Sequence, residues 1–395
     1  MDTSTSRTPG ESKEPVTHMP MVSTHERLPL ILRLGGFIRA HRAVTYTLAF
    51  SLLFGIALFI TPFKYVISSP GPTWNVIDTT KDDKRLIEIT DAKTYPTNGA
   101  LMMTTVSSQG GPGSYVTGAQ VIIAAFSPST TVTPLSELYP ENVTRESISR
   151  ISDAQMVSSQ TTAEAIALGS LGYTVPARIA VQEVPKTSPA YGLLMPGDVL
   201  TSLAAKGKDT VTLSQFDSLF TTLRTIEGGQ TVTLGVRRGN VQQYVDVKVQ
   251  KSTKGEGSEL GIYINPKIDL PLKIQFHLEG VGGPSAGTMF ALGIVDELTP
   301  GSLTGGKKIA GTGALALDGR VQAISGIPQK MTGAKRDGAD WFLAPAGNCD
   351  EVPGNIPKGL HVVKVSTFDE ARTAVEAIAK GEGETLPSCD VAGKS

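Results

Sequence analysis

Two side chains in the C-terminal half could carry out hydrolysis together: Ser285 and Lys330. The serine lies in the small-residue stretch Gly282-Gly283-Pro284-Ser285-Ala286-Gly287. An apolar run from Thr288 to Leu298 follows this stretch and has the composition of a helix. Because proline suits the first turn of a helix, the pattern predicts that Ser285 lies at a helix N-terminus.

The backbone at such a position can stabilise negative charge. Free amides and the positive end of a helix dipole stabilise the oxyanion that forms when a serine attacks a carbonyl. The glycines would let a substrate backbone approach closely. Gly283, Ser285 and Ala286 are therefore the candidate oxyanion donors.

Lys330 lies on a predicted helix from Ile327 to Arg336. A lysine with a pKa near 10.4 is protonated and cannot act as a base, so burial must lower its pKa toward neutrality. Apolar neighbours at Ile324, Ile327 and Met331 favour such burial. The sequence thus predicts a serine nucleophile with a lysine general base.

Short strands and helices surround these two residues. Alternation predicts a strand over Leu272–Leu278, and Asp318-Gly319 predicts a hairpin turn between strands at 308–317 and 320–324. Further expected elements are a strand beginning at Trp341, a strand at 360–365 and a helix at 369–380. The fold class expected for the whole chain is α+β.

These motifs together resemble the proteolytic domain of Lon-type serine peptidases. They are Pro284-Ser285-Ala286-Gly287, Ala310-Gly311-Thr312-Gly313, Asp318-Gly319-Arg320-Val321 and Gly326-Ile327-Pro328-Gln329-Lys330. The resemblance implies a Lon-type domain over residues 258–382, with Ser285 as nucleophile, Lys330 as general base and Thr312 positioning the lysine. Many Lon peptidases carry an acidic residue three positions before the serine, where this chain has Gly282.

Upstream, residues 172–252 predict a strand at Ala177–Val184, another strand that begins at Gly197-Asp198-Val199-Leu200, a helix at Ser214–Arg224 and a hairpin around Gly239-Asn240. This order resembles the PDZ domains of bacterial proteases. It implies a peptide-binding module, which we place with a preceding helix at residues 151–255. Gly172 and Tyr173 are weak candidates for the loop that receives a peptide's carboxylate; a plain turn is the equal alternative.

The N-terminal part predicts a membrane anchor. Residues 1–42 read as a disordered, basic tail, and the uncharged run from Ala43 to Thr61 is about 28 Å long as a helix, which matches a bilayer's hydrocarbon core. We predict a transmembrane helix at 43–62, and the basic residues before it place the N-terminus in the cytoplasm. A cleaved signal peptide is the rival interpretation. Residues 63–150 are expected to form a small β-rich extracytoplasmic region, with short strands at 65–68, 100–106 and 120–125.

The complete layout of anchor, PDZ-like domain and Lon-type domain resembles the membrane-anchored PDZ-Lon proteins of bacteria. It implies an ATP-independent, extracytoplasmic serine endopeptidase that acts on unfolded segments or exposed C-termini, with the lipid bilayer as a further partner. Homo-oligomer formation stays open. The Walker-like stretch Gly301–Lys308 lacks the final Ser or Thr and joins no strand to a following helix, so we expect no ATP binding.

Two other functions stay open at this stage. The pattern Gly283-x-Ser285-x-Gly287 also fits the nucleophile elbow of an α/β-hydrolase, with Asp340 or Asp350 and His361 completing a triad. An inactive PDZ scaffold is the non-enzymatic alternative. His277 alternates with apolar residues on its predicted strand and reads as structural.

Composition excludes several classes of function. The formal net charge is −1, so nothing global indicates nucleic-acid binding. The five histidines are scattered and form no metal motif, and no cofactor is expected. Cys349 and Cys389 are candidates for a disulfide if this end of the chain lies outside the cytoplasm. Residues 383–395 are expected to be a polar C-terminal tail.

Overall fold

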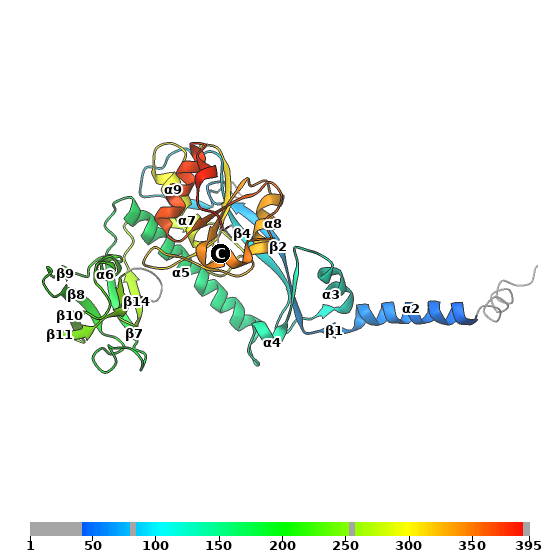
Figure 1. Cartoon of the computed structure of the whole chain (residues 1–395), viewed down its shortest axis with the longest axis horizontal. Helices are drawn as coiled ribbons and strands as arrows, with labels where there is room; N and C mark the ends of the chain where they lie inside the picture. The colour runs from blue at the N-terminus through cyan, green and yellow to red at the C-terminus, as the bar shows by residue number, and fades with distance from the viewer. Residues whose placement is uncertain (1–41, 80–83, 253–256, 390–395) are drawn as a thin grey trace, which may run out of the picture. The chain divides into compact units, whose positions relative to one another are not determined.

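The computed structural model describes residues 42–79, 84–252 and 257–389 (Figure 1). The chain divides into two units, residues 1–60 and 61–395. The described part of the first unit is helix α2 (Arg42–Ile60), whose stretch Ala43–Ile60 is apolar and long enough to cross a membrane. The helix ends two residues earlier than predicted because Pro62 disfavours helical backbone at the residue before it. Apart from Arg42, the predicted tail over residues 1–42 lies outside the described residues.

Unit 61–395 is built on a six-stranded sheet in the order β20-β19-β16-β4-β2-β6. Four of these strands, β4, β16, β19 and β20, run parallel, and β2 is antiparallel to both β4 and β6. The bounds are β2 (Tyr65–Asn75), β4 (Ala100–Gly110), β6 (Thr131–Pro134), β16 (Lys308–Gly311), β19 (Trp341–Pro345) and β20 (His361–Val365).

The prediction that residues 63–150 form a region of their own is wrong. Strand β4 pairs in parallel with β16, with Ala100 opposite Lys308 and Met103 opposite Gly311. Parallel partners are joined by long crossovers, so the local sequence of β4 carries no sign of its partner. The β-rich segment therefore supplies half of the sheet that carries the C-terminal motifs.

Helices cover both faces of this sheet. Alternate residues of each strand point to opposite faces. Leu101, Ile309 and Leu343 pack in the main core with α5 (Arg145–Ser170), α7 (Gly287–Leu298) and α9 (Phe368–Ala379). Their neighbours in sequence, Ala100, Ala310 and Phe342, belong to a second core with α8 (Ile327–Arg336). The helices predicted near these four positions are confirmed: the ends of α8 are as predicted, and those of the other three differ by at most one residue.

A second sheet is inserted into this architecture. Its order is β11-β10-β8-β7-β14, with β9 paired to β8. The elements are β7 (Ala177–Glu183), β8 (Val199–Ala205), β9 (Val211–Thr212), α6 (Ser218–Arg224), β10 (Thr231–Arg238), β11 (Val241–Lys248) and β14 (Tyr263–Ile268). The predicted hairpin at Gly239-Asn240 is confirmed as the β10–β11 turn.

The two ends of this insertion lie side by side. Ile268 pairs with Ala177, and the Asp269 amide donates to the Pro176 carbonyl at 2.8 Å. We call residues 177–268 the insertion. Two predicted boundaries are therefore wrong: β14 belongs to the insertion and not to a domain starting at 258, whereas α5 packs beside the Ser285 loop and not with a domain spanning 151–255.

The segment 118–125 is a helix, not the strand predicted at 120–125. Helix α3 (Gly118–Ala125) begins with a capping box in which Thr117 and Gln120 satisfy each other's backbone amides. A short apolar run such as Val121–Ala125 fits strand or helix equally, and the cap decides between them.

The remaining elements are short. Strand β15 pairs with β3, and the β17–β18 hairpin turns at Asp318-Gly319, whereas β16 belongs to the main sheet and not to that hairpin. Their bounds are β1 (Pro62–Phe63), β3 (Ile87–Ile89), β5 (Val116–Thr117), α4 (Leu135–Leu138), β12 (Gln250–Lys251), β13 (Ser258–Glu259), β15 (Ile274–Phe276), β17 (Ala314–Leu315), β18 (Val321–Gln322), η1 (Ala346–Glu351) and η2 (Gly383–Thr385).

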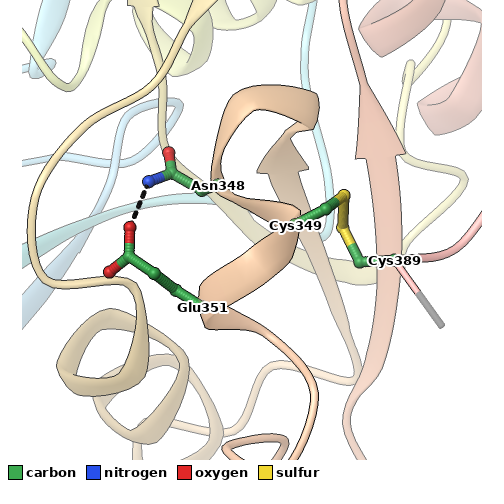
Figure 2. Close-up of a disulfide and its surroundings, with 4 residues drawn as sticks. All are labelled: Asn348, Cys349, Glu351 and Cys389. Carbon is green, nitrogen blue, oxygen red and sulfur yellow. Dashed lines mark hydrogen bonds between the residues drawn. A yellow bond between two sulfur atoms is a disulfide. The ribbon is translucent and has the colours of Figure 1, made fainter. Parts of the chain in front are cut away.

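The C-terminal segment is held to the protein by a disulfide. Cys349 in η1 is bonded to Cys389, with the two Cα atoms 5.0 Å apart (Figure 2). Cys389 is buried in the second core, and the Lys364 amide donates to the Pro387 carbonyl. Up to Cys389, therefore, the residues predicted as a tail are packed against β20 and η1.

Candidate active site

The Ser285 loop connects β15 to α7. Its turns use Gly280 and Gly283, which have φ angles of 71° and 85° that only glycine adopts without strain. The Ser285 carbonyl accepts hydrogen bonds from the Gly313 amide at 2.8 Å and from Thr312 Oγ1 at 3.0 Å. The serine is thus fixed by the segment that follows β16, immediately before helix α7 begins.

Lys330 reaches this serine from helix α8. Its Nζ lies 2.8 Å from Ser285 Oγ and 2.9 Å from Thr312 Oγ1. The side chain is 3% exposed, and its neighbours Ile327 and Met331 are fully buried. The structure therefore brings together the three residues predicted from separate motifs.

Burial changes the acidity of Lys330. Desolvation disfavours the charged ammonium and lowers the pKa of Lys330 from 10.5 to about 7. Among the described residues no carboxylate forms an ion pair with it, so no ion pair offsets this effect. A large fraction of the amine is consequently neutral near pH 7, and its lone pair can accept the Ser285 proton.

Thr312 connects the two residues. Its Oγ1 accepts a hydrogen bond from Lys330 Nζ and donates one to the Ser285 carbonyl. The threonine is fully buried. This arrangement fixes the lysine relative to the serine backbone, which agrees with the positioning role implied by the sequence motif.

The candidate oxyanion donors differ in their availability. The Gly283 amide donates to the Ser152 carbonyl of α5 at 2.9 Å, so Gly283 is not a free donor and that part of the prediction is wrong. No hydrogen bond within the described part of the chain engages the amides of Ser285 and Ala286. These two amides, just before α7, remain as donors for an oxyanion.

The absence of an acidic residue at position 282 has a steric reason. A Cβ atom added to Gly282 would overlap Ser152 Oγ and lie 3.0 Å from Ser152 Cβ. Helix α5 also contacts the loop at Ser159, whose Oγ donates to the Pro284 carbonyl at 3.0 Å. The helix fills the space that a longer side chain at position 282 would need.

The histidines predicted as alternatives are engaged elsewhere. His361 stacks on Trp341, with ring centroids 4.6 Å apart, and its Nδ1 lies 3.4 Å from Glu384. His277 Nε2 lies 2.6 Å from Glu88. No contact within the described residues joins either histidine to Ser285, so the structure does not assemble the triad of an α/β-hydrolase.

Gly172 and Tyr173 do not form a carboxylate-binding loop. The Gly172 amide donates to the Gly169 carbonyl and the Tyr173 amide to the Leu168 carbonyl, both at 3.0 Å. With Gly172 at φ 84°, this is a Schellman cap that ends α5. Both amides are therefore used within the helix end, and this prediction is wrong.

A better candidate for a loop that receives a peptide's carboxylate is Leu260-Gly261-Ile262, which the sequence pattern did not single out. It has the same pattern of Leu-Gly followed by a large residue, but it leads into β14, the end strand of the inserted sheet. Gly261 has a φ of 68°, and the Leu260 carbonyl accepts from Ser188 Oγ at 3.1 Å. The pattern occurs twice in the sequence, and only the topology tells the two copies apart.

Asn348 links the disulfide to the helix that carries the lysine. Its side chain accepts from the Ile324 amide at 2.9 Å, donates to the Ile324 carbonyl at 2.7 Å and donates to Glu351 (Figure 2). Ile324 lies just before α8, and Cys349 follows Asn348 directly. The Cys349–Cys389 disulfide is thus connected, through Asn348 and Ile324, to the start of the Lys330 helix.

Within the described residues, no group of three or more His, Cys, Asp or Glu side chains is placed to hold a metal ion. The site around Ser285 is formed by side chains and backbone amides of this chain. It combines a hydroxyl, a buried amine and two free amides.

Comparison with known proteins agrees with this geometry. Residues 276–377 match the Lon protease (S16) C-terminal proteolytic domain. Lon protease 2 of Herpetosiphon aurantiacus is 32% identical over 150 residues, which cover 37% of this chain and 18% of that protein. Lon protease of Mycoplasma pneumoniae is 31% identical over 190 residues, which cover 46% of this chain and 20% of that protein. The match thus spans about a fifth of the length of these relatives.

Solved PDZ domains are also similar to part of the chain. The PDZ domain of an SdrC-like protein from Listeria monocytogenes is 21% identical and covers 22% of this chain and 85% of its own, with a TM-score of 0.19. The corresponding domain from Listeria innocua is 22% identical and covers 22% of this chain and 93% of its own, with a TM-score of 0.20. The Lon matches and the described site show an α+β chain that carries a Lon-type (S16) proteolytic domain.

Proposed function

We propose that this chain is a serine endopeptidase in which Ser285 is the nucleophile and Lys330 the general base. The observation that carries the proposal is the 2.8 Å contact between a buried lysine nitrogen and the serine hydroxyl. A lysine held in an apolar site with a lowered pKa is a suitable partner for a serine nucleophile. The match of residues 276–377 to Lon proteolytic domains supports the same chemistry.

The proposed reaction proceeds in two proton-coupled stages. Neutral Lys330 takes the proton from Ser285 Oγ as that oxygen attacks the scissile carbonyl, and the amides of Ser285 and Ala286 stabilise the oxyanion. The Lys330 ammonium then gives its proton to the leaving amine, which leaves an acyl-serine. Water, deprotonated by the same lysine, hydrolyses this ester and restores the free hydroxyl.

Substitutions test the dyad directly. Ser285→Ala and Lys330→Met should abolish cleavage of an unfolded protein substrate, while a single cooperative melting transition shows that both variants still fold. Lys335→Met, on the same helix but away from the serine, is the matched control and should stay active, as should His361→Ala. Loss of activity in His361→Ala with retention in Lys330→Met would replace the dyad by a histidine mechanism. Activity in Ser285→Ala would exclude both.

We propose that the insertion presents peptides by strand addition to β14. Among the described strands β14 is the last of its sheet and has no partner on its outer edge, and an extended peptide can hydrogen-bond to such an edge. Ser258 Oγ donates to the Leu223 carbonyl, which places the 260–262 loop near the C-terminal end of α6. The edge of β14 would then hold the peptide, with its carboxylate toward the Gly261 loop.

Paired glycine variants test this peptide site. Gly261→Ala should weaken binding of peptides with a free C-terminus, because a side chain at φ 68° strains the loop and approaches Ser188 and Gln250. Gly239→Ala is the matched control, since its φ is 61° but it lies on the β10–β11 turn with open space around it. Equal affinity for a free and an amidated peptide would argue against carboxylate recognition.

We propose that cleavage needs no ATP. The Walker-like stretch 301–308 leads into strand β16, whereas a phosphate-binding loop follows a strand and opens a helix. Its turn is closed by a hydrogen bond from the Lys307 amide to the Thr304 carbonyl. Cleavage of a disordered substrate by the purified chain should proceed at the same rate with and without ATP and Mg²⁺, and a dependence on both would contradict the proposal.

We also propose that α2 anchors the chain and that residues 61–395 lie outside the cytoplasm. The basic residues that precede the apolar run support this orientation. Protease added to intact cells should then digest an epitope placed after Lys380. Protection of that epitope until the membrane is opened would reverse the orientation.

A further inference from the structure

A second surface of unit 61–395 has no role in the peptidase site. Helix α3 and the residue stretch before it expose large apolar side chains: Tyr115 is 58% exposed, Ile122 43%, Ile123 71% and Phe126 85%. We call these four residues the α3 surface. Single exposed apolar residues are ordinary on proteins, but four large ones within the short segment 115–126 indicate a partner.

The polarity of α3 is unusual for a helix that faces water. Its inner side packs the smaller Val121 and Ala124 in a satellite core with Ile67. Its outer side carries Ile122, Ile123 and Phe126. An amphipathic helix on a water-soluble surface places its larger apolar residues inward, so the outer side of α3 fits an apolar environment.

The lack of charged side chains around the α3 surface indicates which kind of partner it can bind. Residues 94–136 contain no Asp, Glu, Lys or Arg. The surface therefore offers no charged group for an ion pair with a nucleic acid, a charged peptide or an anionic headgroup. A partner that presents hydrocarbon suits it best.

Chain connectivity brings the α3 surface close to the end of the proposed anchor. Strand β1 begins two residues after Ile60 and pairs with β5, with Pro62 opposite Thr117 and Phe63 opposite Val116. Three extended residues span about 10 Å, so the β1–β5 pair lies within that distance of the end of α2. Thr117 is also the N-cap of α3, so the eight residues of the helix start at this pair.

We propose that the α3 surface lies in the lipid interface of the membrane, where Ile122, Ile123, Phe126 and Tyr115 contact the boundary between headgroups and acyl chains. Interfacial helices bury their apolar faces about 5–10 Å deep, which is within the reach set by the β1–β5 pair. Tyr115 suits this position because its ring is apolar and its hydroxyl can stay hydrated. The inference rests on the proposed membrane anchoring by α2, and it gives the bilayer a second contact that steadies the peptidase unit.

Spin labels on the full chain in phosphatidylcholine vesicles test this inference. The two cysteines of the chain are bonded to each other, so a single introduced cysteine can be labelled selectively. Three variants are compared: Leu52→Cys on α2, Ile123→Cys on α3 and Tyr244→Cys on β11. Ile123 and Tyr244 are both 71% exposed, which makes Tyr244 a matched control in the insertion. Each labelled variant must first show the native melting temperature.

The readout is the accessibility of each label to oxygen, which concentrates in lipid, relative to a water-soluble nickel complex. We expect the ratio to fall in the order Leu52, Ile123, Tyr244. A ratio at Ile123 equal to that at Tyr244, with Leu52 in lipid, overturns the α3 contact while the anchor stands. A Leu52 label in water overturns the anchor and the α3 contact together.

A second copy of the chain is the alternative occupant of the α3 surface. In that arrangement the Ile123 label would be shielded from both reagents, and its spectrum would show spin–spin broadening that disappears on dilution with unlabelled protein. That outcome would overturn the lipid contact. Because the α3 surface carries no charge, the expected lipid signal should also be unchanged by high salt and by anionic lipid.

Discussion

Lys330 combines a basic side chain with a site that disfavours its charge. Burial lowers its pKa to about 7, and the neutral form is the one that can accept the Ser285 proton. The value of kcat/KM should therefore rise with pH, reach half its maximum near pH 7 and fall about tenfold per unit below that. A pH–rate profile on a short peptide measures this.

A pH profile that stays flat between pH 5 and 9 would contradict a lysine base. The same profile measured on Lys335→Met is the control, because that substitution removes a lysine of α8 without touching Ser285. Its midpoint should match that of the unaltered chain.

The same depressed pKa makes folding stability depend on pH. Between pH 7 and about 10 the unfolded chain binds a proton at Lys330 that the folded chain does not, so this residue's contribution to stability increases with pH, by up to about 1.4 kcal/mol per unit. Lys330→Met removes the titrating group. The variant should be more stable than the unaltered chain at pH 6, and this advantage should shrink toward pH 10.

Denaturant titrations at pH 6 and pH 9.5 measure this difference. At high pH the neutral amine keeps its hydrogen bonds to Ser285 and Thr312, which methionine cannot make. An advantage for Lys330→Met that is constant across this range would mean that the lysine is not desolvated as the structure indicates.

Helix α5 and the Ser285 loop form one structural unit, held together by hydrogen bonds from Gly283 to Ser152 and from Ser159 to Pro284. Gly282 faces Ser152, and a Cβ at position 282 would overlap the Ser152 hydroxyl. Gly282→Ala should therefore displace the loop and reduce kcat by about 10-fold to 100-fold, since small misplacements of reacting groups are costly. Steady-state kinetics on a short peptide measures the loss.

The double variant Ser152→Ala/Gly282→Ala is the internal control. Removing the hydroxyl leaves a methyl group 3.0 Å from the new side chain, a tight contact that small shifts can relieve. The double variant should recover part of the lost kcat, and Ser152→Ala alone should be nearly normal. A double variant as slow as Gly282→Ala would show that the contact with α5 is not the cause.

The C-terminal segment is a second such element, because a disulfide joins it to η1. Cys349 and Cys389 are separated by 40 residues, and closing a loop of that size is worth about 4 kcal/mol in the chain-entropy model. Reduction should lower the unfolding free energy by an amount of this order. The Cys349→Ser/Cys389→Ser variant, which is insensitive to reductant, is the control for effects of the reductant elsewhere.

At the scale of the whole molecule, local patterns predicted the site better than the architecture. Ser285, Thr312 and Lys330 lie in short motifs that can be recognised from the local sequence. The turns near them need particular residues, such as Gly326 and Gly319, because their φ angles are positive. The pairing of β4 with β16 joins residues about 200 positions apart, and no periodicity encodes it.

The inserted sheet shows the same limit. The local pattern predicts its hairpin at Gly239-Asn240, whereas the predicted domain boundary at residue 258 is wrong because β14 pairs with β7, which lies far upstream. The Leu-Gly pattern occurs at 171–172 and again at 260–261. The first copy caps helix α5, whereas the second leads into the edge strand β14, so only the structure separates their roles. Local chemistry fixes turns and caps, whereas strand partners depend on the complete chain.

The discontinuous architecture makes a prediction about truncation. A fragment that starts at residue 258 keeps Ser285 and Lys330 but loses β2 and β4, and with them the strand that covers β16. This fragment should be unfolded by circular dichroism.

The insertion can be removed more easily, because its two ends are close enough to be joined directly: the Asp269 amide donates to the Pro176 carbonyl. Replacing residues 177–268 by a short glycine-rich turn should therefore leave a folded peptidase. Because Phe216 of the insertion packs into the main core, the shortened chain should lose about 3–5 kcal/mol of stability. It should still cleave a disordered substrate, at a rate that no longer depends on a free C-terminus. If the shortened chain is folded but inactive on every substrate, the insertion contributes to the Ser285 site itself and not only to peptide presentation.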